Sequence, residues 1–280
     1  MTSKMAIVAG AACVALAATT VAHAASDSGA VKQTVRTLFA KLKAGDSAGA
    51  TALFAANGSI IDEFAPYHWD SFADWGAAYA AYNTQNGIVT PANTILKFNH
   101  VNVDGGRAYA VATVAYTYTE RGKARKVPGT EVYSLAKGEN GWRIDSFSWF
   151  SKAAVDTGAD AAAIVDAVHR FASMGTPPSP PPSEIVDEFS PFEWEGTTAN
   201  ADWLRDYSHM SAKAGTSDLA INLAAPSHLS ITGDRGYAMF PTVLTFKLHG
   251  KPTAEHGAFA FALDKSDGAW HIASWTWATR

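Results

Sequence analysis

The sequence predicts an α+β fold: two tandem units, each with helices at its N-terminal side and a curved, mainly antiparallel sheet after them. Three observations predict it. A long internal repeat divides the chain, segments with helical periodicity open the repeat, and segments rich in β-branched and aromatic residues close it. Helices that precede a run of strands are typical of the α+β class.

The internal repeat organises the chain into what we call unit one and unit two. The string SIIDEFAPYHW around Asp62 returns as SEIVDEFSPFEW around Asp187, an offset of 125 residues. Three inserted residues follow, after which the offset is 128, as between Trp142 and Trp270. Since matches continue to the end of unit two, the chain is a duplicated domain.

Three helices are predicted in unit one. Residues 31–43 carry an apolar stripe at helical spacing, and Asp46 can cap a second, short helix after them. Residues 71–83 form the third helix, with Trp75 and Tyr79 on one face.

Five strands are also predicted in unit one from their residue pattern. The first covers residues 59–64. The other four form a meander with turn residues between them, and they cover 95–103, 107–119, 127–136 and 141–151. Unit two opens differently, because 159–173 supplies one helix and the proline-rich run 176–183 cannot form a second.

The N-terminus is predicted to be a secretion signal. Lys4 is the only charge before Asp27, an apolar stretch covers 5–21, and Ala22-His23-Ala24 offers a cleavage site. A membrane anchor is the alternative, but the run is short and rich in alanine. The predicted division is signal peptide 1–24, first domain 26–152, linker with helix and proline-rich loop 153–183, and second domain 184–280. We therefore expect a periplasmic or secreted protein.

The composition argues against a disordered chain and against a nucleic-acid-binding protein. Hydrophobic residues make up 48% and charged residues 17%, which supports real cores, and the net charge is -4 without an evident block of Lys and Arg. Cys13, the only cysteine, lies in the predicted signal peptide. The sequence has no phosphate loop, dinucleotide glycine fingerprint, nucleophile elbow or metal-ligand spacing, so neither cofactor nor metal is predicted.

The order of the segments resembles the nuclear transport factor 2-like superfamily, and within it the SnoaL-like proteins, relatives of polyketide cyclases and ketosteroid isomerases. The resemblance rests on a helix pair ending in Leu53-Phe54-Ala55, a strand, a long helix and a meander closed by Gly141-Trp142-Arg143-Ile144. It covers nearly all of unit one and unit two from Glu184. It implies cone-shaped barrels around an apolar pocket. Members include isomerases, cyclases, dehydratases, binding modules and dimerisation domains, so the fold alone does not fix the function.

Asp62 is the candidate catalytic residue. Alternation along its strand places it on one face with Ile60 and Phe64, where a carboxyl group is expected to have a raised pKa, as a general base requires. The resemblance implies the same role, because isomerase-type members carry their catalytic acid on this strand. The alternative is structural: Asp62 could accept hydrogen bonds from backbone amides in the turn at Pro66.

Other candidates surround Asp62. Tyr67 and His68 are predicted as its catalytic partners, because the first helix offers no tyrosine of the kind that ketosteroid isomerases use to stabilise an oxyanion. The predicted ligand-binding residues are Trp69, Trp75, Tyr79, Asp187 and Trp194. Glu63 is expected in a solvated or turn position, and His228 as a partly buried, hydrogen-bonded histidine.

Three hypotheses for function remain open. The first is an exported tandem SnoaL-like protein that binds a small apolar or aromatic molecule in the cone of unit one. The second is a cofactor-independent isomerase, cyclase or dehydratase with Asp62 as general base, hence an isomerase or lyase. The third is a pseudo-dimer that binds a protein partner, its cones filled by their own aromatic side chains. The two units are expected to pack on each other, and neither nucleic acid nor, after signal removal, a membrane is an expected partner.

Overall fold

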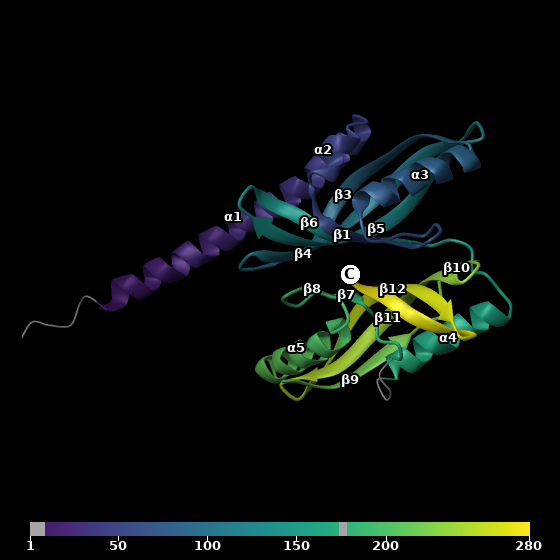
Figure 1. The fold of residues 1–280 in the computed structure, drawn as a ribbon. Helices are drawn as coiled ribbons and strands as arrows, with labels where there is room; N and C mark the ends of the chain where they lie inside the picture. Colours follow the sequence, from purple (N-terminus) through teal and green to yellow (C-terminus); the bar gives the residue numbers. More distant parts are fainter. Residues whose placement is uncertain (1–8, 174–177) are drawn as a thin grey trace, which may run out of the picture.

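The structure is a computed structural model that describes residues 9–173 and 178–280, with side chains from residue 26 onward. Two curved sheets lie face to face in the middle of the molecule, and the helices of each unit lie on the outer side of its sheet (Figure 1). Both units place helices before most of their strands, so the predicted α+β class is confirmed.

Unit one contains three helices and a six-stranded sheet. The helices are α1 (Ala9–Lys43), α2 (Ser47–Thr51) and α3 (Phe72–Asn86). The strands are β1 (Phe54–Ile61), β2 (His68–Trp69), β3 (Ile88–Asp104), β4 (Arg107–Glu120), β5 (Lys123–Gly138) and β6 (Gly141–Ser151). Their order in the sheet is β2-β1-β6-β5-β4-β3, and only β1 and β6 run parallel.

Unit two repeats this plan with two differences. Its helices are α4 (Ala159–Ala172) and α5 (Ala199–Ala214). Its strands are β7 (Glu184–Val186), β8 (Glu193–Glu195), β9 (Thr216–Leu223), β10 (His228–Thr232), β11 (Arg235–Leu248), β12 (Lys251–Ser266) and β13 (Ala269–Thr279). No helix forms in 178–183, the described part of the proline-rich run, and β9 and β10 together take the place of β3 beside β11.

The caps of the short helices follow from the sequence. The side chain of Asp46 accepts a hydrogen bond of 2.8 Å from the amide of Gly49 and begins α2, as predicted. Ser71 caps α3 in the same way through the amide of Asp74. Helix α1 is longer than the predicted 31–43, since it runs on from Ala9 through the described part of the predicted signal peptide. Residues 1–8 of that peptide lie outside the described residues.

Several predicted strand boundaries are wrong. Strand β3 begins at Ile88 rather than at residue 95, and β5 begins at Lys123 rather than at residue 127. Strand β1 covers Phe54–Ile61 and not 59–64, because the chain turns directly after Ile61. The amide of Asp62 donates to the carbonyl of Tyr67, and the amide of Tyr67 donates to the carbonyl of Phe64. The turn thus begins at Asp62, and this residue lies at the end of the strand rather than within it.

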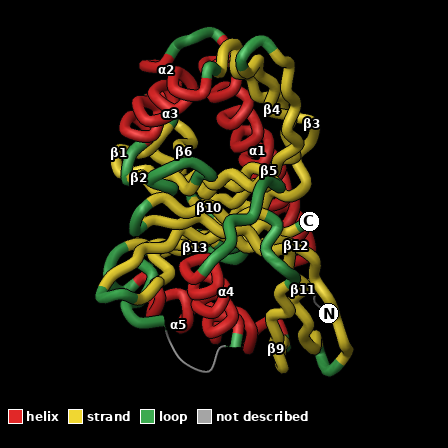
Figure 2. The backbone as a smooth tube through the Cα atoms, turned by 90° about the vertical axis from the view of Figure 1, so that its right-hand side faces the viewer, coloured by secondary structure: helices red, strands yellow, loops and turns green. Residues whose placement is uncertain are grey.

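The core of unit one lies between its helices and the concave side of its sheet. Helices α1 and α3 lie inside the curve of strands β3 to β6 (Figure 2), and apolar side chains of α1 such as Val31 and Val35 are fully buried there. In the described chain, no helix is both long and apolar enough to cross a membrane.

The convex faces of the two sheets meet through an approximately twofold contact. The hydroxyl of Tyr109 donates to the carbonyl of Trp277 at 2.7 Å, and the hydroxyl of Tyr237 donates to the carbonyl of Trp149 at 2.8 Å. Tyr237 and Trp277 are the equivalents of Tyr109 and Trp149 at the offset of 128. Each contact therefore has a partner of the same kind with the units exchanged, as in a symmetric dimer.

Two further features complete this contact: a hydrogen bond between equivalent residues at the approximate twofold axis, and an apolar layer around it. Ser148 hydrogen-bonds Thr276, its own equivalent, with 2.7 Å between the hydroxyl oxygens. Buried apolar side chains from both sheets form one cluster around them, including Ile61, Val111, Val132, Val186, Met239 and Ala260.

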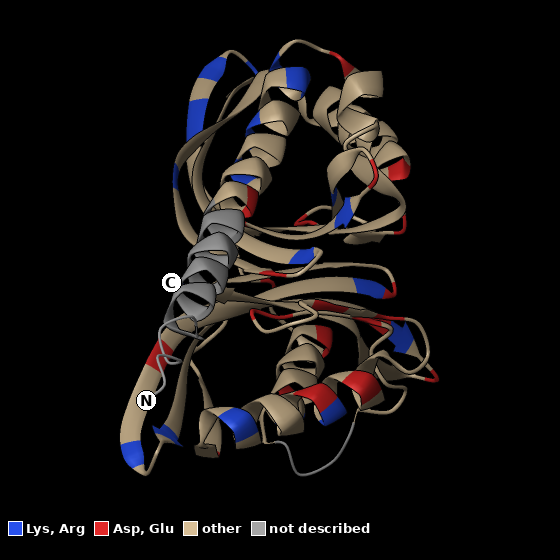
Figure 3. Cartoon of the chain, turned by 90° about the vertical axis from the view of Figure 1, so that its left-hand side faces the viewer, with Lys and Arg blue, Asp and Glu red and all other residues tan. Residues whose placement is uncertain are grey.

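Lys and Arg are spread over both units (Figure 3). One group lies on the hairpin between β4 and β5, where Arg121, Lys123, Arg125 and Lys126 are all exposed. Glycine and alanine separate these residues in the sequence, but the hairpin brings them to one tip. The expectation that no basic block stands out is therefore wrong at this place.

Candidate functional site

A cavity of about 150 Å³ lies inside the cone of unit one. Its walls come from α1, α3 and the concave side of the sheet, and they are largely aromatic. Trp75 and Tyr79 stack with 5.0 Å between their ring centroids, and Phe54 stacks on Phe72 at 4.2 Å. Trp75 and Tyr79, two of the predicted ligand-binding residues, stand at positions i and i+4 of α3 and therefore lie together in one wall of the cavity.

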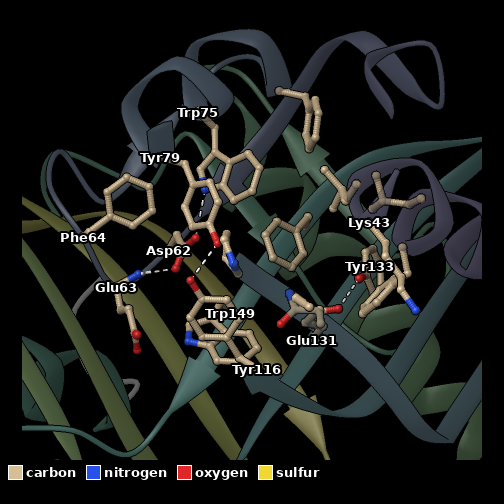
Figure 4. A pocket seen from close by; sticks show the side chains of 18 of the residues that line it. Lys43, Asp62, Glu63, Phe64, Trp75, Tyr79, Tyr116, Glu131, Tyr133 and Trp149 are labelled. Atoms are coloured by element: carbon tan, nitrogen blue, oxygen red, sulfur yellow. Dashed lines mark hydrogen bonds between the residues drawn. The ribbon is translucent and has the colours of Figure 1, made fainter. Parts of the chain in front are cut away.

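Asp62 lies in this wall and is 7% exposed. One carboxylate oxygen accepts a hydrogen bond of 2.9 Å from the indole of Trp75, and the other accepts one of 2.7 Å from the amide of Glu63 (Figure 4). Burial raises the pKa of Asp62 to about 7, and the charge of Glu63 adds to the effect. The backbone bond of the structural hypothesis and the raised pKa of the catalytic hypothesis are therefore both present.

Glu131 is a second acid in the cavity, and sequence reasoning missed it. It lies on β5, is 1% exposed, and accepts hydrogen bonds from the side-chain amide of Asn93 at 3.1 Å and from the hydroxyl of Tyr133 (Figure 4). Burial raises its pKa to about 8, and the charge of Asp62 contributes. A single acid in the run TEVYSLA, on a strand predicted to be buried, was the available signal.

Two phenols supply further polar groups. The hydroxyls of Tyr79 and Tyr116 lie 2.7 Å apart and hydrogen-bond each other beside Asp62 (Figure 4). Burial raises the pKa of both tyrosines, so they stay protonated and can donate near neutral pH. The cavity thus combines an apolar wall with a few hydrogen-bonding groups, which is the usual composition of a small-molecule site.

Tyr67 and His68 do not line the cavity. The hydroxyl of Tyr67 lies 2.9 Å from the hydroxyl of Thr232 in unit two. Nε2 of His68 lies 2.6 Å from a carboxylate oxygen of Glu184, also in unit two. Burial alone would lower the pKa of His68, but the hydrogen bond and charge of Glu184 raise it. Both side chains therefore serve the contact between units, and the structure does not bring them together with the cavity face of Asp62.

The remaining predicted ligand-binding residues also lie elsewhere. Trp69 packs on Phe64 with ring centroids 4.7 Å apart, outside the cavity wall. In unit two, Trp194 donates to Asp206 at 2.9 Å. Asp187 accepts from the indole of Trp203 at 2.9 Å, as Asp62 does from Trp75. The acid and indole pair is therefore common to both units.

The part of the unit-two cone that corresponds to the cavity of unit one is filled by apolar side chains. At the offset of 128, four cavity residues have apolar equivalents: Asn93 becomes Ile221, Tyr116 becomes Leu244, Glu131 becomes Phe259, and Tyr133 becomes Phe261. Phe171 of α4 packs edge-on against Phe259 and Phe261 with centroids 5.7 and 5.4 Å away. Unit two is thus filled at the positions of the unit-one cavity, as the third hypothesis expects, and unit one is not. A different hollow of unit two, of about 230 Å³, is lined by Phe171, Trp270 and Ile272.

No cluster of three or more His, Cys, Asp or Glu that could hold a metal ion occurs among the residues that the structure describes. The acids of the cavity have aromatic and amide neighbours instead.

Comparisons with known proteins give matches among solved structures. No protein-family model matches the sequence, and no curated protein matches it. The structure is similar to a nuclear transport factor 2-like superfamily protein from Salmonella enterica serovar Typhimurium, with 17% identity, 48% of this chain and 96% of that chain covered, and a TM-score of 0.41.

Two further solved structures cover a similar share. A protein with a cystatin-like fold from Caulobacter vibrioides has 17% identity, 52% of this chain and 99% of that chain covered, and a TM-score of 0.38. A ketosteroid isomerase-like protein from Erwinia carotovora atroseptica has 13% identity, 45% and 96% covered, and a TM-score of 0.38. Each match spans about half of this chain, and the descriptions of the Salmonella and Erwinia proteins name groups that the sequence resembles.

Proposed function

We propose that unit one binds a small apolar or aromatic molecule that carries a carbonyl or hydroxyl oxygen. One observation carries the proposal: the aromatic cavity of unit one holds Glu131 and Tyr133, whereas the filled cone of unit two has Phe259 and Phe261 at these positions. Burying an ionisable group costs stability, and Phe259 and Phe261 show that the fold does not require polar groups at these positions. A ligand that uses them accounts for their presence in the hollow cone alone.

The chemistry of the two acids fits such a ligand. With a pKa of about 8, Glu131 is mostly protonated at neutral pH and can donate to a ligand oxygen. With a pKa of about 7, Asp62 is partly ionised there and can accept from a ligand hydroxyl. The aromatic walls would supply about 25 cal/mol for each Å² of apolar ligand surface removed from water.

The same two acids favour a second candidate, proton transfer without a cofactor. A carboxylate with a pKa near the working pH is suited to act as a base, and a protonated carboxyl group nearby is suited to act as an acid or to stabilise an oxyanion. In this candidate Asp62 would abstract a proton next to a carbonyl and Glu131 would donate to the carbonyl oxygen. The enzyme would be an isomerase or a lyase.

Export remains part of the proposal. Its support is the apolar stretch that ends at Ala22-His23-Ala24. N-terminal sequencing of the protein recovered from the periplasm or medium of an expressing bacterium is expected to begin at Ala25.

Binding is tested with a panel of phenols, naphthols and naphthalene by calorimetry. The Glu131→Phe variant copies unit two and fills the cavity, so we expect binding of any panel member to weaken by more than about tenfold, or about 1.4 kcal/mol. The matched control is Asp187→Asn, which lies in the filled cone and is expected to bind like the wild type. The proposal is contradicted if no panel member binds the wild type, or if folded Glu131→Phe binds as well as the wild type.

A further inference from the structure

The wall of the cavity reaches the boundary between the units at Glu63. This residue lines the cavity with its neighbour Asp62, and its own carboxylate points to the boundary. There it accepts a hydrogen bond from the hydroxyl of Ser151 and lies 3.4 Å from Nδ1 of His228, on β10 of unit two. Glu63 was expected in a solvated or turn position. It lies in a turn, but its carboxylate contacts Ser151 and the ring of His228.

His228 is aimed at Glu63 by its surroundings. It is 4% exposed, its Nε2 lies 3.0 Å from the hydroxyl of Ser230, and its ring packs edge-on against Tyr237. Its Nδ1 is buried and lacks a well-aligned hydrogen bond within the described residues, so the carboxylate of Glu63 is the group it faces. A buried ring nitrogen without a well-aligned partner is uncommon in folded proteins.

We propose that unit two completes the site of unit one: His228 is a positioning residue that holds the Glu63 carboxylate at the boundary and so keeps its negative charge beside the Asp62 carboxyl group in the cavity wall. The inference rests on the proposed function, since it concerns the same cavity. The link to Asp62 is short, because the amide of Glu63 donates directly to the carboxylate of Asp62 at 2.7 Å.

Electrostatics support the same link. Burial alone would raise the pKa of Glu63, but the nearby ring of His228 and the hydroxyl of Ser151 bring it below its usual value. Glu63 is therefore ionised, and its charge is one cause of the raised pKa of Asp62. Tyr82, Tyr118 and Tyr237 also lie near the pair, and their raised pKa values keep them neutral in this range.

The equivalent place in unit two lacks this arrangement. Glu188, the equivalent of Glu63, lies near a second acid, Glu255, which stands where unit one has Val127. Burial and the charge of Glu255 raise the pKa of Glu188 to about 9, so it is protonated at neutral pH. An ionised glutamate at the boundary therefore accompanies the hollow cone and not the filled one, and His100, the equivalent of His228, is the matched control.

The experiment uses the full chain and follows carboxyl ¹³C signals of Asp and Glu against pH without ligand. Removing the histidine with His228→Leu is expected to raise the pKa of Glu63 by about one unit, a tenfold change in proton affinity. His100→Leu should leave the titration of Glu63 unchanged. His228→Gln keeps a donor near Glu63 and should raise the pKa of Glu63 by less than His228→Leu does; it is the test variant if His228→Leu fails to fold.

Binding of 2-naphthol completes the test. We expect His228→Leu to weaken it by about fivefold, about 1 kcal/mol, while His100→Leu does not. The inference is overturned if Glu63 titrates unchanged in the folded His228 variants, or if binding is unaffected despite a shifted titration. If the wild type binds no panel member, the proposed function fails, and the titration alone then decides whether His228 holds Glu63.

Discussion

Asp62 and Glu131 both face the cavity of unit one, but only Asp62 has an equivalent acid in unit two. Asp62 and Asp187 accept from an indole and from the next amide in the same geometry. Since Asp187 lies in a filled cone, these bonds stabilise the turn in both units. The proposed function of unit one therefore rests on Glu131 and on the use that unit one makes of Asp62.

The shared indole bond gives a prediction at this scale. Trp75→Phe and Trp203→Phe each remove a buried donor to an acid, and each is expected to lower the free energy of unfolding by about 1–3 kcal/mol. The loss should be larger at pH 8.5 than at pH 5.5, because the indole stabilises the ionised aspartate. Urea unfolding at both pH values measures this.

Ligand binding separates the two variants. Only Trp75 lines the cavity, so Trp75→Phe should also weaken 2-naphthol binding. Equal binding losses in Trp75→Phe and Trp203→Phe would contradict the assignment of the site to unit one.

At the scale of elements, the sequence predicted the meander best. Strands β4 to β6 and β11 to β13 have apolar alternation and turn residues that are local signals, and the repeat confirms each of them with its copy. The end of β1 was wrong because the turn at Asp62 depends on two backbone bonds to Tyr67 and Phe64 that no local pattern reveals. The split of β3 into β9 and β10 likewise depends on pairing with β11.

Packing between neighbouring strands explains one repeated pair, glycine on β5 or β12 and tryptophan on β6 or β13. A methyl group at Gly129 would overlap the ring of Trp149, and one at Gly257 would overlap that of Trp277. We expect Gly129→Ala and Gly257→Ala each to lower stability by about 1–3 kcal/mol, through overpacking. Thermal melts measure this loss.

The cavity distinguishes the two glycines. Trp149 is a cavity wall, so Gly129→Ala should also change 2-naphthol affinity, while Gly257→Ala should not. An unchanged melting temperature in both variants would show that the tryptophan rings can move away without loss.

At the scale of the whole molecule, the site could be predicted only in part. Asp62, Trp75 and Tyr79 were found because they lie close together along one unit. The positions of Tyr67 and His68 could not be found, since they depend on how two sheets pack against each other. Glu131 needed knowledge of which strand face lines a hollow cone, and the sequence alone does not distinguish the hollow cone from the filled one.

Buried acids in both units predict how stability depends on pH. Burial raises the pKa of Asp62 and Asp187 to about 7, of Glu131 to about 8 and of Glu188 to about 9. Between about pH 5 and pH 8 the folded chain binds more protons at these groups than the unfolded chain, so the free energy of unfolding falls as pH rises. We expect a higher melting temperature at pH 5.5 than at pH 8.5.

A control variant isolates one of these groups. Glu131→Gln removes an acid whose stability penalty grows with pH, so its melting temperature should fall less between pH 5.5 and pH 8.5 than that of the wild type. The exposed acids with lowered pKa values, such as Asp160, are fully ionised throughout this range and do not alter the trend. A wild-type melting temperature that rises toward pH 8.5 would contradict the prediction.

The hydrogen bond between Ser148 and Thr276 shows what joining the two units in one chain permits. In a homodimer, a residue on the symmetry axis faces its own copy, and every mutation is inherited by both subunits at once. After gene duplication and fusion, each half accumulates its own mutations. A serine can then face a threonine, phenylalanines can fill one cone without closing the other, and a histidine can be kept for the benefit of its neighbour. One half was thus free to become a permanent partner, while the other kept a space in which selection for a ligand could act.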